Sequence, residues 1–477
     1  MITEDKIIAL QLQTQSTNTP EYILKKLIEE HDTREMEDGV RYYHNENKKI
    51  KSRQIYIYDD QGRKMLDPDA VNERIPHNWH KLLVDQKVSY LLGKPPVVNA
   101  NPDDYAEVLN EWLDEDFDDK LQELGKNSSN KGAEYLHPYI DEDGSFKYVV
   151  IPREQSIPIY DQHYQEEIVG FIRFYPVWVN DKERIRAEWW TKEDVTYYIQ
   201  QDSGIYELED LDRNPDSHFY YNGNGYGWGK VPFVGFANNE EKYSDLKYYK
   251  EIIDIYDLVV SDMANDLVDI QKMLYVLRGY QGTSLAEFMT NLRRYRAIKV
   301  DAEQGAGVDT VSANIDTQAI DSFLDRQEEN IFLFGQGVNV KTDRFGNSPS
   351  GIALKFLFHL LDLKANIMAR KFAFGVKEFI WFLTEYLGIS GKYSAPQDAI
   401  DSVKITFTKS MLVNDLELVD MAMKSNGIIS KETIVANHPW TEDANEEIER
   451  MEKEREEYLQ SEIQLNPLED EEDEEEI

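Results

Sequence analysis

The sequence has 477 residues, and its 91 acidic side chains outnumber 52 basic ones, which gives a formal net charge of -39. That balance argues against a protein that coats nucleic acid, because such affinity comes from cations that neutralise phosphates. The absence of cysteine excludes disulfides and thiolate metal sites and fits a reducing cytoplasm or a particle assembled there. The first residues, MITEDKIIAL, lack the cationic start and long apolar core of a secretory signal, so we expect a soluble cytoplasmic product of two to four domains.

The N-terminal part is predicted to be mainly helical. Residues 1–50 are expected to form polar, peripheral helices, and residues 79–92 carry a helical apolar pattern that ends at Gly93. His77 and His80 have a spacing at which two ligands on a helix can share a metal, but no third ligand is evident nearby. We therefore expect ordinary polar residues at a helix start and no metal site. Residues 105–124 predict one acidic amphipathic helix.

The periodicity then changes from that of helices to that of strands. Between residues 135 and 220, β-branched and aromatic residues alternate with polar ones between short turns, which predicts an antiparallel β region. Asp141, Asp143 and Gly144 faintly resemble a calcium loop, but the later ligands are absent, so a hairpin turn is favoured. The glycine-rich segment 220–240 lacks the GxxxxGK[ST] pattern that cradles phosphates.

A second helical region is expected to begin at Ser244, which with Asp245 is placed to cap a long helix. Apolar residues at spacings of three and four continue to about residue 271, and a compact α/β stretch follows to residue 308. This stretch contains the densest basic cluster of the chain, Arg293, Arg294 and Arg296. Two interpretations stay open: surface charge on a helix, or a contact with a partner or nucleic acid.

A further apolar helix is predicted from Ile315 to Gly335. Gly335 and Gly337 are expected to end it, because glycine tolerates the left-handed conformation that closes a helix. The next residues, GVNVKTDRFGNSPSG, are rich in turn formers and carry Lys341 and Arg344, so they predict an exposed loop.

A long helix from Gly351 to about Tyr386 is apolar on nearly every side. So many apolar positions cannot share one stripe, and a helix of this kind is buried on several faces. Charged residues, among them Lys364 and Arg370, leave no uninterrupted apolar run of the ~20 residues that a bilayer requires. We therefore expect something other than its own chain to cover part of this helix. One strand, short helices over 412–436 and a solvated glutamate-rich tail are expected beyond it.

The order of these segments resembles that of phage portal proteins, the head-to-tail connectors of long-tailed phages, particularly the siphovirus type of Gram-positive hosts. The likeness spans about residues 70–455, and its specificity lies in an ordered set of segments. They are RIPHNWHKLLVDQKVSYLLGKPPVV, EDGSFKYVVIPREQSIPIYD, NNEEKYSDLKYYKEIIDIYDLVVSDMAND, SPSGIALKF and GIISKETIVANHPWTEDANEEIERMEKE.

The resemblance implies an α+β, mainly α, portal fold with a mixed α/β wing, a two-helix stem, a small α/β clip, a long tunnel helix and a helical crown. The implied regions are 1–243 as the wing, 244–271 as the first stem helix, 272–308 as the clip, 309–336 as the second stem helix, 337–349 as the tunnel loop, 350–387 as the long helix, 388–445 as the crown, and 446–477 as an acidic helix and disordered tail.

The resemblance also implies two groups of site residues. Those of the tunnel loop that faces the DNA channel would be Val338, Asn339, Val340, Lys341, Thr342, Asp343, Arg344 and Phe345. Those of the clip that docks partners would be Arg278, Tyr280, Arg293, Arg294 and Arg296. Lys341 and Arg344 would make transient phosphate contacts while Asp343 limits them, although ordinary loop charges are an alternative.

The function implied is a homo-oligomeric ring, usually of twelve copies in the family, at one capsid vertex. It would pass double-stranded DNA during packaging and ejection and dock the terminase large subunit, the capsid and scaffolding proteins, and a head-completion adaptor. The protein would be assembled in the host cytoplasm, belong to the virion, and need no membrane, cofactor, metal or catalytic group. The alternatives are another head-tail joining protein of the virion or an acidic cytoplasmic hydrolase.

Overall fold

In the computed structural model the chain forms two compact units. The first comprises Met1–Asn339 and Leu360–Ser410, and the second comprises Val340–His359 and Met411–Ile477. The structure describes the backbone of residues 2–13, 19–58, 61–67, 70–164, 167–270, 274–278, 307–311, 316–339, 341, 351–410, 415–436, 438, 440–441, 444 and 447–455. Within these ranges, the side chains of 12–13, 19, 269–270, 274–278, 307–311, 351–355 and 415–418 are not described.

The N-terminal helices are α1 (Glu4–Gln13), α2 (Thr19–Glu29), α3 (Arg34–Tyr43) and α4 (Lys48–Lys51). The expectation that this region is peripheral is wrong for α1 and α2. Their apolar side chains join a core cluster with strands that follow more than a hundred residues later; the cluster includes Ile7, Leu10, Ile23, Leu24, Leu27, Ile157, Ile159 and Ile172. Both helices are therefore part of the first unit's core.

The acidic segment expected as one helix forms two, α6 (Asp103–Trp112) and α7 (Glu115–Lys131). The break has a local cause, because Asp114 caps α7 and its carboxylate accepts a hydrogen bond from the Phe117 amide at 3.2 Å. Before them, α5 (Trp79–Leu92) ends at Gly93 as predicted. Among the described residues, no helix carries an apolar stretch long enough to cross a membrane.

The predicted antiparallel β region is confirmed. A seven-stranded sheet has the order β1 (Ile2–Thr3), β7 (Ser156–Tyr160), β8 (Ile168–Val179), β9 (Lys182–Trp190), β10 (Asp194–Gln200), β11 (Tyr206–Leu208), with β12 (Asp216–Ser217) also on β10. Its pairs are antiparallel apart from β1 with β7. The turn at 141–145 belongs to a hairpin, because the Asp141 carboxylate accepts hydrogen bonds from the amides of Asp143 and Ser145.

Smaller sheets complete the β structure of the first unit. One has the order β15 (Val234–Ala237), β5 (Ala133–Ile140), β6 (Phe146–Ile151), after which a 3-10 turn, η1, spans Arg153–Gln155. The other pairs are β13 (Phe219–Tyr221) with β14 (Asn224–Tyr226), and β2 (Tyr56–Tyr58) with β3 (Lys64–Leu66). The short strand expected near residue 56 is therefore present as β2.

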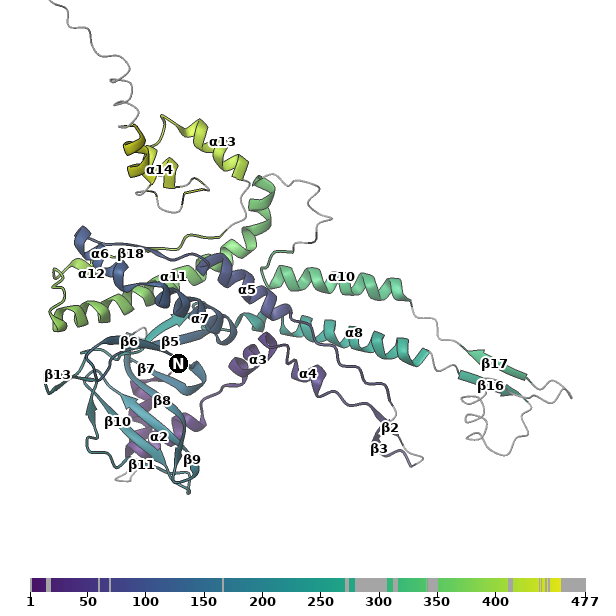
Figure 1. Cartoon of the computed structure of the whole chain (residues 1–477). Helices are drawn as coiled ribbons and strands as arrows, with labels where there is room; N and C mark the ends of the chain where they lie inside the picture. Colours follow the sequence, from purple (N-terminus) through teal and green to yellow (C-terminus); the bar gives the residue numbers. More distant parts are fainter. Residues whose placement is uncertain are drawn as a thin grey trace, which may run out of the picture. The chain divides into compact units, whose positions relative to one another are not determined.

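Two helices lie side by side after the β region (Figure 1): α8 (Lys250–Ile270) and α10 (Thr317–Phe334). A 3-10 turn, η2 (Asp245–Tyr248), precedes α8, and Ser244 caps this turn by accepting a hydrogen bond from the Leu246 amide at 3.2 Å. Beyond α8, β16 (Leu274–Arg278) pairs with β17 (Gly307–Val311). The helix expected over 309–336 therefore begins later, as α10, because residues up to 311 form a strand.

The predicted long helix is present as α11 (Gly351–Ser390), which has 40 residues. Its side chains buried to 2% exposure or less are Leu361, Ala365, Met368, Phe372, Val376, Phe379, Ile380, Phe382, Leu383 and Leu387. Gly375 lies so close to Phe236 that a Cβ there would be 2.8 Å from the ring. This glycine therefore lets α11 approach β15.

The segment that directly follows α11, up to Ser410, belongs to the first unit. There, α12 (Ala399–Ser402) leads into β18 (Lys404–Thr406), which pairs with β4 (Val97–Asn99). Residues 388–410, which are expected to open the crown, thus belong to the first unit. The second unit contains α13 (Asp415–Ser425) and α14 (Lys431–Ala436), and Ser430 starts α14 as predicted by accepting a hydrogen bond from the Thr433 amide. The chain is an α+β protein.

Candidate functional site

The described part of the predicted tunnel loop is its base, and this base is anchored to α5. The side-chain amide of Gln86 donates a hydrogen bond to the Val338 carbonyl at 2.9 Å, and the Val338 amide donates one to Gln86 Oε1 at 3.0 Å. The Val338 side chain is 2% exposed. One glutamine thus holds both backbone polar groups of this residue, which fixes the direction in which the chain leaves α10.

The helix α10 ends at Gly335 as predicted, but the residue with the left-handed conformation is a different one. Gly335 has a right-handed φ of -74°, and the left-handed residue is Gln336, with a φ of 52°. A Cβ on Gly335 or Gly337 would overlap the side chain of Leu83, which is 1% exposed. The two glycines therefore serve close packing of the helix end against α5. The left-handed conformation expected of them is wrong for this turn.

A buried ion cluster lies next to this anchor. The Lys87 ammonium is 2.6 Å from Asp245 Oδ2, and the Lys364 ammonium lies 3.0 Å from the same oxygen. Asn238 donates a hydrogen bond to Asp245 Oδ1 at 2.8 Å and accepts one from Lys87 at 2.6 Å. Lys364 also donates to the Gly335 carbonyl at 2.9 Å. The cluster thereby ties α5, η2 and α11 to the end of α10.

The charges of this cluster are stabilised by one another. Burial alone would raise the pKa of Asp245, but Lys364 and Lys87 outweigh that effect and hold the pKa below its usual range. Burial lowers the pKa of Lys87 to about 8, so this lysine remains mostly protonated at neutral pH. The desolvation of a buried ion pair offsets much of its attraction, and removal of one partner leaves a buried charge without compensation. The cluster is therefore a positional clamp on the loop base.

The two histidines whose spacing alone would suit a shared metal are engaged in other contacts. His77 Nδ1 is 2.8 Å from Asp257 Oδ1, and His80 Nδ1 is 2.7 Å from the Tyr249 hydroxyl. Burial lowers the pKa of His80 to about 3, so its ring is neutral. Among the residues that the structure describes, no group of three or more His, Asp and Glu side chains is arranged to hold a metal ion.

The structure brings together only part of the predicted site. Val338 and Asn339 lie at the loop base, and Lys341 is exposed. Val340, Thr342, Asp343, Arg344 and Phe345 lie outside the described residues. Of the predicted clip residues, Arg278 ends β16 opposite Gly307, and Tyr280, Arg293, Arg294 and Arg296 lie outside the described residues.

Sequence reasoning missed the residues that anchor the loop. Gln86 and Lys87 are polar neighbours within the apolar pattern of α5, and Lys364 interrupts an apolar helix. A lysine in such a position signals a buried partner, because an unpaired ammonium is costly to desolvate. The partner, Asp245, lies far away in the sequence. The lysines therefore predict that a buried acidic partner exists, but they do not predict which residue it is.

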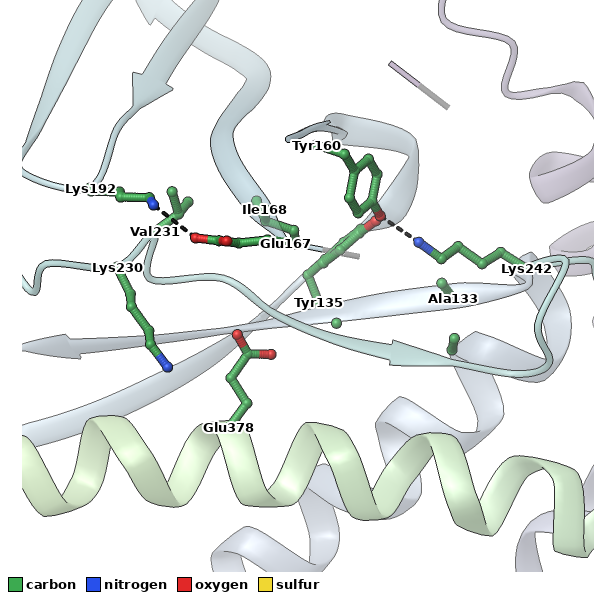
Figure 2. Close-up of a pocket in the computed structure, with 12 residues that line it drawn as sticks. Ala133, Tyr135, Tyr160, Glu167, Ile168, Lys192, Lys230, Val231, Lys242 and Glu378 are labelled. Carbon is green, nitrogen blue, oxygen red and sulfur yellow. Dashed lines mark hydrogen bonds and ion pairs between the residues drawn. The ribbon is translucent and has the colours of Figure 1, made fainter. Parts of the chain in front are cut away.

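A separate polar cavity of about 460 Å³ lies in the first unit, bordered by β5, β15 and α11 (Figure 2). On its left side Lys192 and Glu167 pair at 2.8 Å, and on its right side Lys242 donates a hydrogen bond to the Tyr160 hydroxyl. Glu378 points into it from α11; burial raises the pKa of this carboxyl, against the effect of nearby Lys230.

Comparison with known proteins gives consistent matches. The family model "Phage portal protein, SPP1 Gp6-like" matches residues 24–461. The "Portal protein" of Bacillus phage SPP1 is 40% identical over 454 residues, which cover 94% of this chain and 89% of the relative. The "Portal protein" of Clostridium phage phiCD119 is 33% identical over 428 residues, which cover 85% of this chain and 89% of the relative.

Proposed function

The chain belongs to the SPP1 Gp6-like family of phage portal proteins, and from that membership we propose how its parts build the portal. Proteins of this family are structural virion components without enzymatic activity, and they form homo-oligomeric rings through which DNA passes. We propose a ring of twelve copies at one capsid vertex, which serves packaging and ejection of double-stranded DNA. The capsid, a scaffolding protein, the terminase large subunit and a head-completion adaptor are its proposed partners.

One observation on α11 supports the ring most directly. Leu363, Ile367 and Phe374 are 44%, 51% and 73% exposed, although a different face of the same helix is buried. Their spacings of four and seven residues place them on one stripe. An exposed apolar stripe on an otherwise buried helix marks an interaction surface. In a ring, every copy presents this stripe to a neighbour, so all copies are covered equally.

We propose the following assignment of regions. The wing comprises residues 1–243 and 388–410, because β18 pairs with β4. The stem is formed by α8 and α10, which lie side by side, and the clip by 272–311, where β16 pairs with β17. Residues 337–349 form the tunnel loop, 350–387 the long helix, 411–445 the crown and 446–477 an acidic end.

The charge of the chain supports passage of DNA without tight binding. With a net charge of -39, most of its surface offers phosphates few cations to exchange for their counterions. Lys341 and Arg344 of the tunnel loop would make brief phosphate contacts, one pair per copy, and Asp343 would weaken them. The clip, including Arg278, Tyr280, Arg293, Arg294 and Arg296, would receive the terminase motor.

Electron microscopy of the purified protein tests this proposal. The expected images show rings with a central hole wide enough to admit duplex DNA. A dispersed monomer at high protein concentration would rule out the ring.

A further inference from the structure

The polar cavity of the first unit contains positive groups that have no direct acidic partner. Its volume of about 460 Å³ lies within the range of small-molecule pockets, about 300–1,000 Å³. Three lysines line it, and Lys192 is paired with Glu167 at 2.8 Å. Within the described ranges of the chain, the ammonium groups of Lys230 and Lys242 form no ion pair with a carboxylate. Two positive charges thus remain without a direct partner in a protein whose net charge is -39.

Both of these lysines contact aromatic rings instead. Lys230 Nζ lies 4.1 Å from the centre of the Trp381 ring. Lys242 Nζ lies 4.4 Å from the centre of the Tyr160 ring and donates a hydrogen bond to its hydroxyl. A ring face attracts a cation but leaves its charge in place, and an ammonium has three donors. Both lysines can therefore still donate to an anion in the cavity.

A pair of buried tyrosines adds a further donor. Tyr135 and Tyr160 are 3% and 5% exposed, and their hydroxyls lie beside each other at one end of the cavity (Figure 2). The Tyr160 oxygen accepts the hydrogen bond from Lys242. Even if one tyrosine hydroxyl donates to the other, the second has no acceptor among the described residues. Because buried hydroxyls in proteins are normally hydrogen-bonded, this proton calls for an acceptor that the described chain does not supply.

Glu378 is the carboxyl that faces these donors. It projects from α11 between Lys230 and Tyr135 (Figure 2) and forms no hydrogen bond or ion pair within the described part of the chain. Burial raises the pKa of Glu378, and the charge of Lys230 opposes that effect. In its protonated form Glu378 is one more donor to a ligand, and in its ionised form it repels an anion.

The balance of these groups favours an anionic ligand. Two ammonium groups and a hydroxyl proton face one carboxyl, so donors outnumber acceptors even when Glu378 is ionised. Behind Lys242, the Arg153 guanidinium donates to the Lys242 carbonyl at 2.9 Å, and burial and then the charge of Arg153 lower the pKa of Lys242. Glu240, an acidic neighbour of Lys242, is paired with Lys371. Hydrogen bonds from an ammonium to a phosphate or carboxylate are short and strong, because both groups are charged.

We propose that this cavity binds a small molecule through a phosphate or carboxylate group, which Lys230, Lys242 and one tyrosine hydroxyl hold. The bound group joins β5, the end of β7, α11 and the loops on either side of β15. Binding of this kind stabilises the folded protein in proportion to the logarithm of ligand concentration. The site lies wholly within the first unit and does not depend on the ring.

Protection of the two lysines from acylation tests the proposal directly. The unaltered protein is treated with sulfo-NHS acetate in the presence of phosphate, pyrophosphate or citrate, with sodium chloride at equal ionic strength as the reference. Mass spectrometry gives the labelling rate of each lysine. Lys230 and Lys242 should react more slowly with an oxyanion than with chloride, and Lys182, an exposed lysine of β9 that pairs with Asp202, should react equally. The anion that protects most identifies the group that the ligand carries.

Calorimetric titration with that anion tests which side chains hold it. Lys230→Gln and Lys242→Gln should each raise the dissociation constant by about tenfold or more, because each removes a charge-assisted hydrogen bond. Lys182→Gln is the matched control and should leave the constant unchanged. Glu378→Gln keeps a donor and removes a negative charge, so this variant should bind the anion at least as tightly as the unaltered protein. Lys230 is exposed, so its substitution leaves the interior undisturbed.

The outcomes decide between an anion site and its alternatives. Equal labelling of both lysines in every oxyanion and in chloride overturns the proposal. Loss of anion binding in Glu378→Gln also overturns it, because that result assigns the carboxylate to the binding of a cation. Protection that appears only on assembly, without a response to added anion, assigns the cavity to a side chain of a neighbouring copy and overturns it too. The measurements use assembled and dissociated protein alike, so failure of the site leaves the proposed ring untouched.

Discussion

Replacing Gly337 with alanine tests the packing that holds the base of the proposed tunnel loop. The new methyl would overlap the side chain of Leu83 and lie 3.0 Å from Gln86 Oε1, the atom that accepts the Val338 amide. Leu83 is 1% exposed, and a side chain in a close-packed interior can move little without disturbing its neighbours. The φ of Gly337 is not positive, so the effect comes from contact and not from an unfavourable backbone conformation.

The expected loss of unfolding free energy follows from three effects. Overpacking costs about 1–3 kcal/mol, and weakening the Gln86 hydrogen bond costs about 1 kcal/mol more. Replacing glycine restricts the unfolded chain and offsets about 0.4–1 kcal/mol. We expect Gly337→Ala to destabilise the first unit by about 1–3 kcal/mol in urea unfolding at fixed protein concentration.

A double-mutant cycle identifies the contact. Leu83→Ala alone should cost about 2–5 kcal/mol because it leaves a cavity. Combined with Gly337→Ala it should cost less than the sum by about 1–2 kcal/mol, since the cavity accepts the new methyl. Gly388→Ala is the matched control, because a Cβ there would meet nothing within 4 Å. Additive single effects, or a stable Gly337→Ala protein, would refute this account of the helix end.

Three further predictions concern the clamp, the loop and the β region. Lys364→Met should cost about 3 kcal/mol in urea unfolding at pH 7.5, because it removes one of the two cations that compensate buried Asp245; a cost below about 1 kcal/mol would contradict the clamp. Lys341→Ala combined with Arg344→Ala should leave ring assembly intact but reduce the yield of packaged genomes, and a normal yield would remove their proposed role. Burial lowers the pKa of His137 to about 4. Between pH 6.5 and 4 this histidine is therefore protonated in the unfolded chain and neutral in the folded chain, so the free energy of unfolding decreases as the pH falls. His137→Phe should therefore reduce the stability lost between pH 7.5 and 5 by about 2 kcal/mol; an unchanged loss would show that this histidine does not titrate on unfolding.

The sequence predicted the elements whose signal is local. Apolar spacing located α8, α10 and α11, and alternation located the antiparallel strands. The start of α14 at Ser430 followed from capping chemistry. The break at Asp114 carried the same kind of signal, an aspartate followed by acidic residues, but the long acidic pattern around it concealed the cap.

Features that depend on distant contacts could not be predicted in the same way. The N-terminal helices are core elements because their apolar faces meet Ile157, Ile159 and Ile172, and nothing within residues 1–50 indicates that partner. Gly337 looks like a helix terminator in sequence, yet its role depends on Leu83. The clamp likewise needs Lys87 and Asp245 to meet, and their pairing arises only from the fold.

The central claim is that the exposed stripe of α11 is covered by an identical chain in a ring. Because the protein has no cysteine, Ile367→Cys can report on that stripe by its rate of maleimide labelling, with Ile205→Cys as the control. When native mass spectrometry shows assemblies that are multiples of the 55.8 kDa chain, labelling at residue 367 should be clearly slower than in dissociated chains, and labelling at 205 should be unchanged. Equal labelling of residue 367 in both states, or a protein that stays at the mass of one chain, would contradict the account.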